Sequence, residues 1–246
     1  MRVPGFDPHI DIAILAKILQ KEDEDFFKWY NKMLKEDKNY PFTEEQKNYF
    51  KYINTRRKKG KVVNFSGVYG AGPPKISQAS GMTLEESTEL HKIYWIRNKA
   101  VKQIAADVTI RVLFKSGESK DYLGKHLMAI KRDYQTEFYS KVESMWLFNP
   151  VSGFWYSLRK PKDSFSTLNQ GTGVFCFDTW VYEVRKRGIK ISLQYHDEIG
   201  FPFLREEEDK VREALTCAIK ETNNKLKLNV PLGISIDIGS NYAEAH

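Results

Sequence analysis

The sequence IKISLQYHDEIGFPF, residues 189–203, has apolar side chains at alternate positions on both sides of a polar centre. Alternation with a period of two residues is typical of a β-strand, and here it occurs twice. We therefore predict a hairpin of two strands with His196, Asp197 and Glu198 at its tip. Adjacent carboxylates suit a hard divalent cation that takes its other ligands from phosphate and water. A polar turn without a metal is the alternative that this stretch alone leaves open.

The composition favours a globular protein with an anionic partner. The 246 residues suffice for one large domain or two smaller ones. No apolar run approaches the ~20 residues of a membrane span, and the N-terminus has no signal-peptide core. We therefore expect no membrane association. Cys176 and Cys217 are not in a paired spacing, so we expect free thiols and a location in the cytoplasm. The net charge of +7 and the pI near 9.1 indicate nucleic acid as the commonest kind of partner.

Local signals predict a mostly helical first part. Apolar spacing indicates a helix over about residues 10–19, and Thr43 with Gln46 three positions later is a helix-start signature. A separate helix is expected over about residues 55–69, ended by the glycines and prolines that follow it.

Another capping sequence, Thr83 with Glu86, predicts one long helix that continues through Ile104. Residues 114–146 are charged and aromatic, and we expect them to be a surface insertion or a pair of exposed helices.

From Trp146 onwards the pattern becomes mixed. We predict a turn into a strand, a polar loop over residues 160–166, a helix over 169–184 with Val174 among its apolar positions, and then the hairpin. An amphipathic helix over 206–223 and a last strand over 232–238 follow. The fold class is therefore α+β, with the boundary near residues 146–150.

The spacing of the residues in the basic run near residue 57 is more informative than their charge. Arg57, Lys61, Phe65 and Tyr69 are four residues apart in series, so on a helix they form one stripe. Cations can hold a polyphosphate while an aromatic ring lies against a base. An amphipathic helix that packs Phe65 and Tyr69 into a core explains the same residues, and the spacing alone does not decide between the two.

The segment RRKKGKVVNFSGVYG, residues 56–70, resembles the fingers-helix motif of family A DNA polymerases, the group of bacterial DNA polymerase I and phage replicases. YHDEIGF, residues 195–201, resembles their palm hairpin. Three shorter segments also match in the family's order: Asp7-Pro8-His9, the helix start Gln170-Gly171-Thr172, and Asn241-Tyr242 up to His246. The five segments together cover essentially the whole chain.

The resemblance implies fingers at residues 1–148, with an insertion at about 114–146, and the C-terminal half of an antiparallel palm at 149–246. In the palm, Asp197 is expected to be a ligand of two catalytic Mg²⁺ ions, Glu198 to assist at the same site, and His196 to contact the primer end. In the fingers, Arg57 and Lys61 are expected to bind the incoming dNTP, with Lys61 protonating the pyrophosphate.

Further contacts follow from the same resemblance. Phe65 is expected to stack on the nucleotide, and His9 to approach the phosphates. A Phe here, rather than Tyr, usually goes with poor acceptance of dideoxynucleotides in this family.

The contacts with the DNA primer-template are expected at Tyr69 and Gly70, which border the templating base, and at Gln170 in the minor groove. Lys162 and Ser166 stand where polymerase I has Arg and Asn, so the pattern is weaker there.

One part of the family's active site has no counterpart. In-line phosphoryl transfer by two metals uses carboxylates on both sides of the ion pair. In this family a second essential Asp precedes the Asp-x-His segment, which here begins at residue 7.

We therefore expect the C-terminal subunit of a split polymerase. Its partner chain would supply the thumb, the first catalytic Asp and, if the complex proofreads, an exonuclease. A phage-encoded subunit would act in the host cytoplasm. An inactive truncated polymerase fragment and a basic DNA-binding replication module without chemistry are the alternatives.

Overall fold

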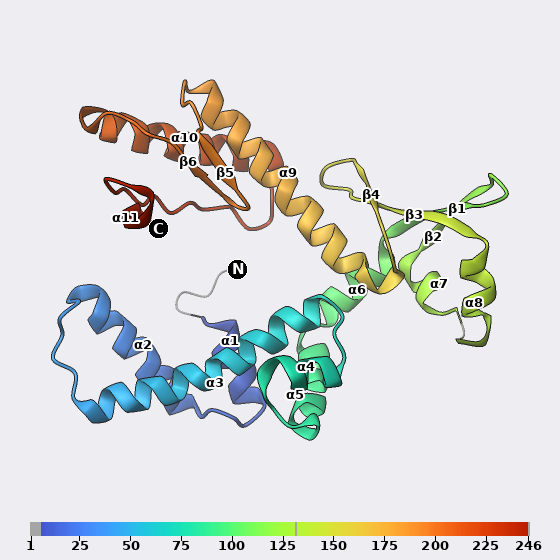
Figure 1. Ribbon diagram of the computed structural model, residues 1–246, viewed down its shortest axis with the longest axis horizontal. Helices are drawn as coiled ribbons and strands as arrows, with labels where there is room; N and C mark the ends of the chain where they lie inside the picture. Colours follow the sequence, from blue (N-terminus) through green and yellow to red (C-terminus); the bar gives the residue numbers. More distant parts are fainter. Residues whose placement is uncertain (1–5, 131, 246) are drawn as a thin grey trace. The chain divides into compact units, whose positions relative to one another are not determined.

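The structure, a computed structural model, describes residues 6–130 and 132–245 of an α+β chain (Figure 1). The chain divides into two compact units. Among the described residues, the first unit consists of residues 6–130 and 132–148 with Ser157–Thr167, and the second of Asn149–Tyr156 with residues 168–245. The expected α+β class is confirmed, whereas the names fingers and palm remain predictions. Among the described helices, none is long and apolar enough to cross a membrane.

Helices form most of the first unit. They are α1 (Pro8–Leu15), α2 (Lys21–Glu36), α3 (Glu44–Val68), α4 (Pro73–Ser80), α5 (Leu84–Arg97) and α6 (Lys99–Asp107).

The long helix α3 is the element on which its neighbours pack. Its N-terminus is the predicted capping box: the Thr43 N–H donates to the Gln46 side chain at 2.9 Å, and the Gln46 N–H donates to the Thr43 hydroxyl at 3.2 Å. The prediction of a separate helix over 55–69 was wrong, because the turns continue without a break through Val68. The helix ends as predicted where Gly70 takes a positive φ of 65°.

Two predicted helices are shorter than expected. The first ends at Leu15, and Lys17, with φ 59°, turns the chain away before residue 19. The helix that begins after Thr83 does not continue through Ile104 in one piece. It stops at Asn98, whose side-chain amide donates to the Tyr94 carbonyl and whose backbone leaves the helical region. A residue that hydrogen-bonds its own backbone in this way competes with helix continuation.

A hydrophobic core joins these helices. It contains Ile12 of α1, Val63 of α3, Ile76 of α4, and Leu90 and Tyr94 of α5, all buried. This core explains why the helices stay folded although α3 is strongly charged, since tertiary packing provides most helical stability in proteins.

The segment predicted as an insertion or a pair of exposed helices is built on strands. These elements are β1 (Thr109–Phe114), β2 (Ser119–Leu123), α7 (Gly124–Met128), α8 (Arg132–Ser140) and β3 (Val142–Phe148). With β4 (Trp155–Ser157) they give a sheet of order β2-β1-β3-β4, in which β1 is antiparallel to β2 and β3. Ile110 and Val112 of β1 are fully buried. The prediction of helices alone was therefore wrong for this segment.

The 3-10 turn η1 (Pro161–Asp163) and the long helix α9 (Ser164–Lys186) follow β4. The polar loop predicted over 160–166 is therefore mostly helical. Gln170 was predicted at a helix start, but it lies more than a turn inside α9. Val174 is exposed, contrary to its predicted place on the apolar face.

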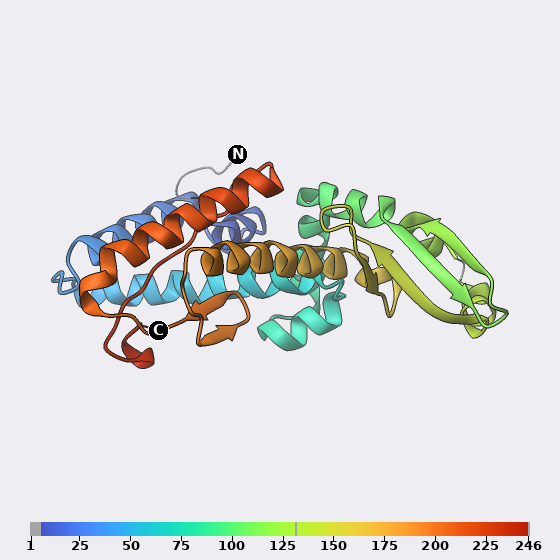
Figure 2. The same cartoon turned by 90° about the horizontal axis from the view of Figure 1, so that it is seen from above.

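The second unit packs a small hairpin on two helices. The hairpin consists of β5 (Leu193–Tyr195) and β6 (Glu198–Gly200), and it lies beside α9 in Figures 1 and 2. The turn η2 (Arg205–Glu207), α10 (Glu208–Leu226) and α11 (Tyr242–Ala245) complete the unit. The predicted amphipathic helix is confirmed as α10, with Val211 and Leu215 buried.

The last predicted strand does not form a ladder. Ile234 and Ile236 pack against the core of α9 and α10, while Ser235 between them is exposed. The alternation is therefore real, but it comes from an extended segment that lies on helices. A strand requires backbone hydrogen bonds to a neighbour as well as a period of two.

A buried carboxylate connects the two helices of the second unit. Glu183 of α9 is 2% exposed, and its side chain accepts hydrogen bonds from Arg187 and from Lys225 of α10. The hydrogen bond from Lys225, followed by that from Arg187, holds the pKa of Glu183 below its ordinary value of 4.5, against the effect of burial.

Replacing this carboxylate should destabilise the protein in a pH-dependent way. We expect Glu183→Gln to lower the free energy of unfolding at pH 7 by about 1 kcal/mol, because the bonds to Arg187 and Lys225 lose their ionic character. Since the pKa is depressed in the folded state, the contribution of Glu183 is present above pH 4.5 and is lost as the pH falls below that value. Urea denaturation at pH 7 and pH 3.5 measures both effects.

Glu208→Gln is the matched control, because Glu208 also pairs with an arginine four residues later, but its side chain is 39% exposed where that of Glu183 is 2% exposed. Exposed pairs contribute little, so this variant should unfold like the parent. An equal loss from both substitutions, or a loss at Glu183 that is the same at pH 7 and pH 3.5, would contradict the assignment.

Candidate nucleotide site and carboxylate hairpin

The predicted stripe on α3 lies on the surface of the first unit. Phe65 is 53% exposed and Tyr69 is 48% exposed, while Lys61 is also exposed and Arg57 is half-buried. The alternative in which Phe65 and Tyr69 pack into a core is therefore excluded. The Lys61 ammonium lies 5.7 Å from the centre of the Phe65 ring, so the cation and the aromatic ring are neighbours on the helix.

Helix α1 approaches this stripe very closely at Gly60. A Cβ atom at residue 60 would lie 2.2 Å from the His9 carbonyl oxygen and 3.0 Å from Ile12. Only glycine therefore allows the two helices to pack at this distance. The approach brings the beginning of α1 against the middle of α3, although the two segments are some fifty residues apart in the sequence.

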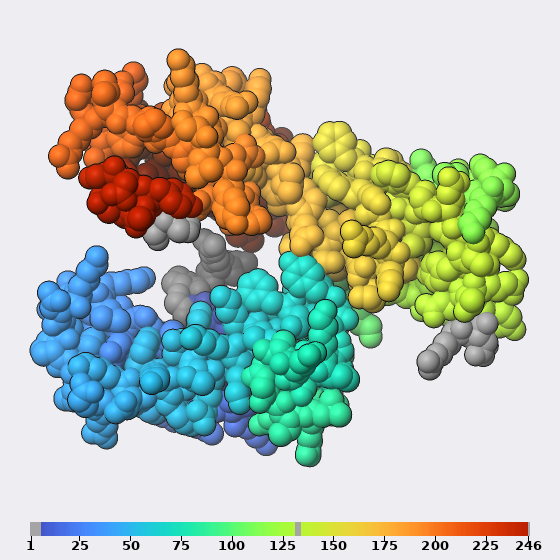
Figure 3. All heavy atoms as spheres, viewed as in Figure 1, coloured from blue at the N-terminus to red at the C-terminus, as the bar shows by residue number. Residues whose placement is uncertain are grey.

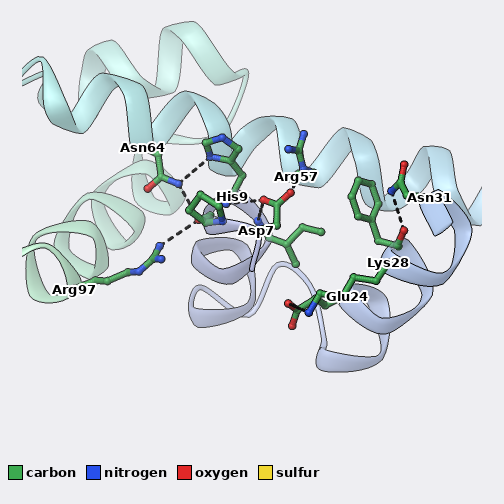
Figure 4. A network of polar contacts seen from close by, with 11 residues as sticks. Asp7, His9, Glu24, Lys28, Asn31, Arg57, Asn64 and Arg97 are labelled. Atoms are coloured by element: carbon green, nitrogen blue, oxygen red, sulfur yellow. Dashed lines mark hydrogen bonds and ion pairs between the residues drawn. The ribbon is translucent and has the colours of Figure 1, made fainter. Parts of the chain in front are cut away.

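Asp7 connects the two helices at this point. One of its carboxylate oxygens caps α1 by accepting from the N–H groups of His9 and Ile10, and the other accepts from Arg57 Nε at 2.7 Å (Figure 4). Burial opposes ionisation of Asp7. The bonds from Arg57 and from the two backbone N–H groups outweigh it and hold the pKa of Asp7 below its ordinary value.

His9 lies beside the aromatic part of the stripe. Its ring centre is 6.0 Å from that of Phe65, and its Nδ1 is 3.0 Å from the Asn64 side-chain nitrogen (Figure 4). Partial burial and the positive charges of Arg57, Lys61 and Arg97 hold the pKa of His9 below its ordinary value, against the attraction of Asp7. The imidazole is therefore neutral at pH 7, and its Nδ1 can accept the proton of the Asn64 amide.

Two further residues hold this arrangement, and neither was predicted from the sequence. Asn64 donates to the Pro8 carbonyl at 2.8 Å as well as contacting His9. Arg97, at the end of α5, donates to the same carbonyl at 3.2 Å and pairs with Asp11 at 2.9 Å. Asn64 directly precedes Phe65 of the stripe, so its position on the helix could have suggested a role. No local signal points to Arg97, because its contacts are made across helices.

This arrangement has the chemistry of a nucleotide site. Arg57, Lys61 and Arg97 surround a neutral imidazole, with Arg57 paired to Asp7 and Arg97 to Asp11, and the exposed Phe65 ring adjoins Lys61. Guanidinium and ammonium groups bind phosphate oxygens, and an exposed aromatic ring offers a face to a base. The first unit thus brings together Arg57, Lys61, Phe65 and His9, all of which were predicted from the sequence.

The end of the stripe differs in character. Tyr69 caps the C-terminus of α3, and Gly70 follows in a left-handed conformation, in which a Cβ atom would lie 3.6 Å from the Lys162 carbonyl oxygen. Both Tyr69 and Gly70 are exposed. Their predicted contact with a templating base stays a prediction.

The carboxylate hairpin belongs to the second unit and has a two-residue turn. Leu193 pairs with Gly200 and Tyr195 with Glu198, so His196 and Asp197 form the loop. His196 has φ 52°, the left-handed conformation that tight hairpin turns require. Asp197 is exposed at this turn, and the His196 ring lies against that of Tyr195, with their centres 4.3 Å apart.

The strands are shorter than predicted, and their apolar residues do not share one face. Leu193 and Tyr195 lie on the same face as Glu198, and both are exposed, whereas Ile199 packs on the core. With two residues in the loop, odd-numbered residues of β5 pair with even-numbered residues of β6. The apolar residues, which are odd-numbered in both strands, therefore lie on opposite faces of the hairpin.

Glu198 has a partner that was not predicted from the sequence. The Tyr242 hydroxyl of α11 donates to the Glu198 carboxylate at 2.8 Å, and this bond raises the pKa of Tyr242 above its ordinary value. The C-terminal match at Asn241 and Tyr242 thus lies at the hairpin, while His246 is outside the described residues. Gln170 is exposed on α9 in the same unit.

Asp197 and Glu198 are hard oxygen donors, which is the type that Mg²⁺ prefers. Within residues 6–130 and 132–245, no three side chains of His, Cys, Asp or Glu gather closely enough to hold a metal ion. Asp197 and Glu198 could supply at most two of the oxygen ligands of such an ion. Cys176 and Cys217 are free thiols, as predicted.

No family model matches the chain, and no curated protein matches it.

The close approach at Gly60 can be tested by adding one methyl group. We expect Gly60→Ala to destabilise the protein by about 1–3 kcal/mol, because the added carbon overlaps the His9 carbonyl and α1 must move. Gly173→Ala is the matched control, since a Cβ there meets nothing within 4 Å on an exposed turn of α9. That variant should gain up to about 1 kcal/mol from helix propensity. Urea denaturation measures both, and two substitutions with the same sign would contradict the packing.

Proposed function

We propose that the chain forms the fingers and part of the palm of a template-directed DNA polymerase of the family A type. It would add dNTPs to a primer once joined to a partner chain. The observation that carries the proposal is the position of His9 beside Phe65 and among Arg57, Lys61 and Arg97. Residues from separate segments thereby provide a cationic group for phosphates and an aromatic ring for a base.

In this proposal each residue of the nucleotide site has a distinct role. Arg57 and Lys61 bind the triphosphate, and Lys61 protonates the pyrophosphate as it leaves. Phe65 stacks on the nucleotide, and neutral His9 donates a hydrogen bond to a phosphate. Asp7 holds Arg57 until the anion arrives, which limits the entropy that the arginine side chain loses on binding.

The hairpin supplies the metal-binding part of the reaction. Asp197 and Glu198 would hold Mg²⁺, and Tyr242 fixes the orientation of the Glu198 carboxylate. When bound, magnesium would activate the primer hydroxyl and neutralise phosphate charge. Further carboxylates, including a first catalytic Asp, would come from the partner chain together with the thumb.

Nucleotide binding by the chain itself tests the first half of the proposal. Anisotropy of a fluorescent dATP analogue should show that Lys61→Ala weakens binding about tenfold or more, since a charge-assisted hydrogen bond is lost. Phe65→Ala should weaken binding of the nucleotide but not of inorganic tripolyphosphate, which has no base. Lys120→Ala, which removes a cation from β2, is the control and should bind like the parent.

Equal binding by the Lys61→Ala variant and the parent would contradict the nucleotide site. A Phe65→Ala variant that loses tripolyphosphate as well would show that the ring does not contact the base.

Primer extension tests the second half of the proposal, the metal-binding role of the hairpin. The chain alone should extend no primer, and addition of a polypeptide with the thumb and the first palm Asp of a family A polymerase should restore magnesium-dependent synthesis. Asp197→Ala should abolish that synthesis, whereas Asp178→Asn on the exposed side of α9 should not. Synthesis by the Asp197→Ala complex would refute the metal role. DNA binding without synthesis in any combination would favour a replication module without chemistry.

A further inference from the structure

A second surface of α3 combines aromatic rings with positive charge, and the proposed nucleotide site does not use it. Two parallel rows run along the helix before Gly60. One row contains Tyr52, Arg56 and Lys59, and the other contains Lys51 and Lys58 with Thr55 between them. Residues spaced by three or four positions are neighbours on a helix surface, so each row is continuous.

The first row contains a stacked pair. The Arg56 guanidinium carbon lies 3.5 Å from the centre of the Tyr52 ring, which is 43% exposed. The Tyr49 ring continues the stack at 6.0 Å from Tyr52 with an interplanar angle of 23°, and the Tyr49 hydroxyl is held by a hydrogen bond to Asp23. These contacts restrict the side chains before any ligand binds. Little further side-chain entropy would therefore be lost on binding.

The second row provides charge without local compensation. Residues 46–68 contain seven cationic side chains and no Asp or Glu. Of the cations in the two rows, none makes an ion pair within 4.0 Å with a carboxylate of the described residues. Lys51 and Lys58 are exposed, and they are separated by about 10 Å along the helix axis.

Three acidic groups lie at the Tyr49 end of this surface, and one, Glu86, interacts electrostatically with Lys59 at the other end. Glu22 and Asp23 lie near Tyr49, and Glu45 is one turn before it on α3. An anionic chain is therefore attracted to the Arg56 end of the surface and repelled from the Tyr49 end. The atoms of α2 and α3 lie at the molecular surface in Figure 3, in blue to cyan.

We propose that this surface, Lys51, Tyr52, Arg56, Lys58 and Lys59, binds single-stranded nucleic acid. Bases stack on the Arg56 guanidinium plane, which the Tyr52 ring supports from its other face, and the lysines contact the phosphates on either side. Aromatic rings and guanidinium planes accept any base, so the binding is tolerant of sequence. Duplexes fit poorly, because their bases are already stacked and their planes are not accessible.

Fluorescence anisotropy with labelled oligo-dT of twenty nucleotides tests this inference on the purified chain. Tyr52→Ala should weaken binding about 5- to 150-fold, the range for one base-stacking contact, because the Arg56 plane loses the ring that supports it, whereas Tyr52→Phe should bind like the parent. Arg56→Lys keeps the charge but removes the plane, so it should also weaken binding. Tyr134→Ala, at an exposed tyrosine of α8, is the matched control and should have no effect.

Salt dependence separates the two rows. Replacing both Lys58 and Lys59 by Ala should reduce the slope of log binding constant against log salt by about 1.4, since each phosphate contact on a single strand contributes about 0.7. Tyr52→Ala should leave the slope unchanged. Circular dichroism melting of each variant identifies any that lose the fold, and Tyr52→Phe and Arg56→Lys are conservative enough to retain it.

Several outcomes would overturn the inference. Binding by Tyr52→Ala and Arg56→Lys equal to that of the parent at every salt concentration would show a basic patch without stacking. A duplex that binds as tightly as oligo-dT would also show a basic patch without stacking, because its bases are not accessible. An oligo-rU probe that binds as tightly as oligo-dT supports contact through bases and phosphates, and one that does not bind restricts the ligand to DNA. The proposed nucleotide site is tested by other residues, so its failure would leave this surface unaffected.

Discussion

The packing of α1 on α3 at Gly60 is the constraint on which the candidate nucleotide site depends. A side chain at this residue would occupy the place of the His9 carbonyl, at 2.2 Å. Because the helices approach so closely, Asp7 can cap α1 and bind Arg57 with the same carboxylate, and His9 reaches Phe65. Without this approach α3 would carry only a row of cations and rings. The close packing places the start of α1 beside this row, and the two segments together form the candidate site.

The parts of the structure that could be predicted are those set by contacts between residues close in sequence. The capping boxes at Thr43 and Thr83 are confirmed, because their hydrogen bonds join residues three positions apart. The predicted hairpin is also confirmed, since its two strands are adjacent in the chain, but its turn contains only His196 and Asp197, and Glu198 belongs to β6 instead of the tip. The stripe on α3 follows from helical geometry alone, so the shared face of Arg57 and Phe65 was predictable once the segment was known to be helical.

The parts that could not be predicted depend on what lies opposite each segment. Residues 232–238 alternate as a strand does, but they lie on helices and have no ladder. Arg97 reaches the start of α1 from the far end of α5, and Tyr242 reaches Glu198 across the hairpin. A periodic pattern identifies which face of a segment is apolar. It does not identify whether a sheet or a helix covers that face, and it contains no information on contacts between distant side chains.

The charge distribution on α3 is difficult to explain by stability alone. Four pairs of cations three or four residues apart occur in it, and each such pair destabilises a helix by about 0.2–0.5 kcal/mol. The neighbouring helix α2 is different, because Lys21 and Lys28 both pair with Glu24. Of these two adjacent helices, α2 thus pairs its cations with a carboxylate, whereas α3 places cations next to one another. A helix that serves only to fill the fold would gain from acids at these positions, and none occurs between residues 46 and 68. The anionic ligands that we propose would remove the repulsion when they bind.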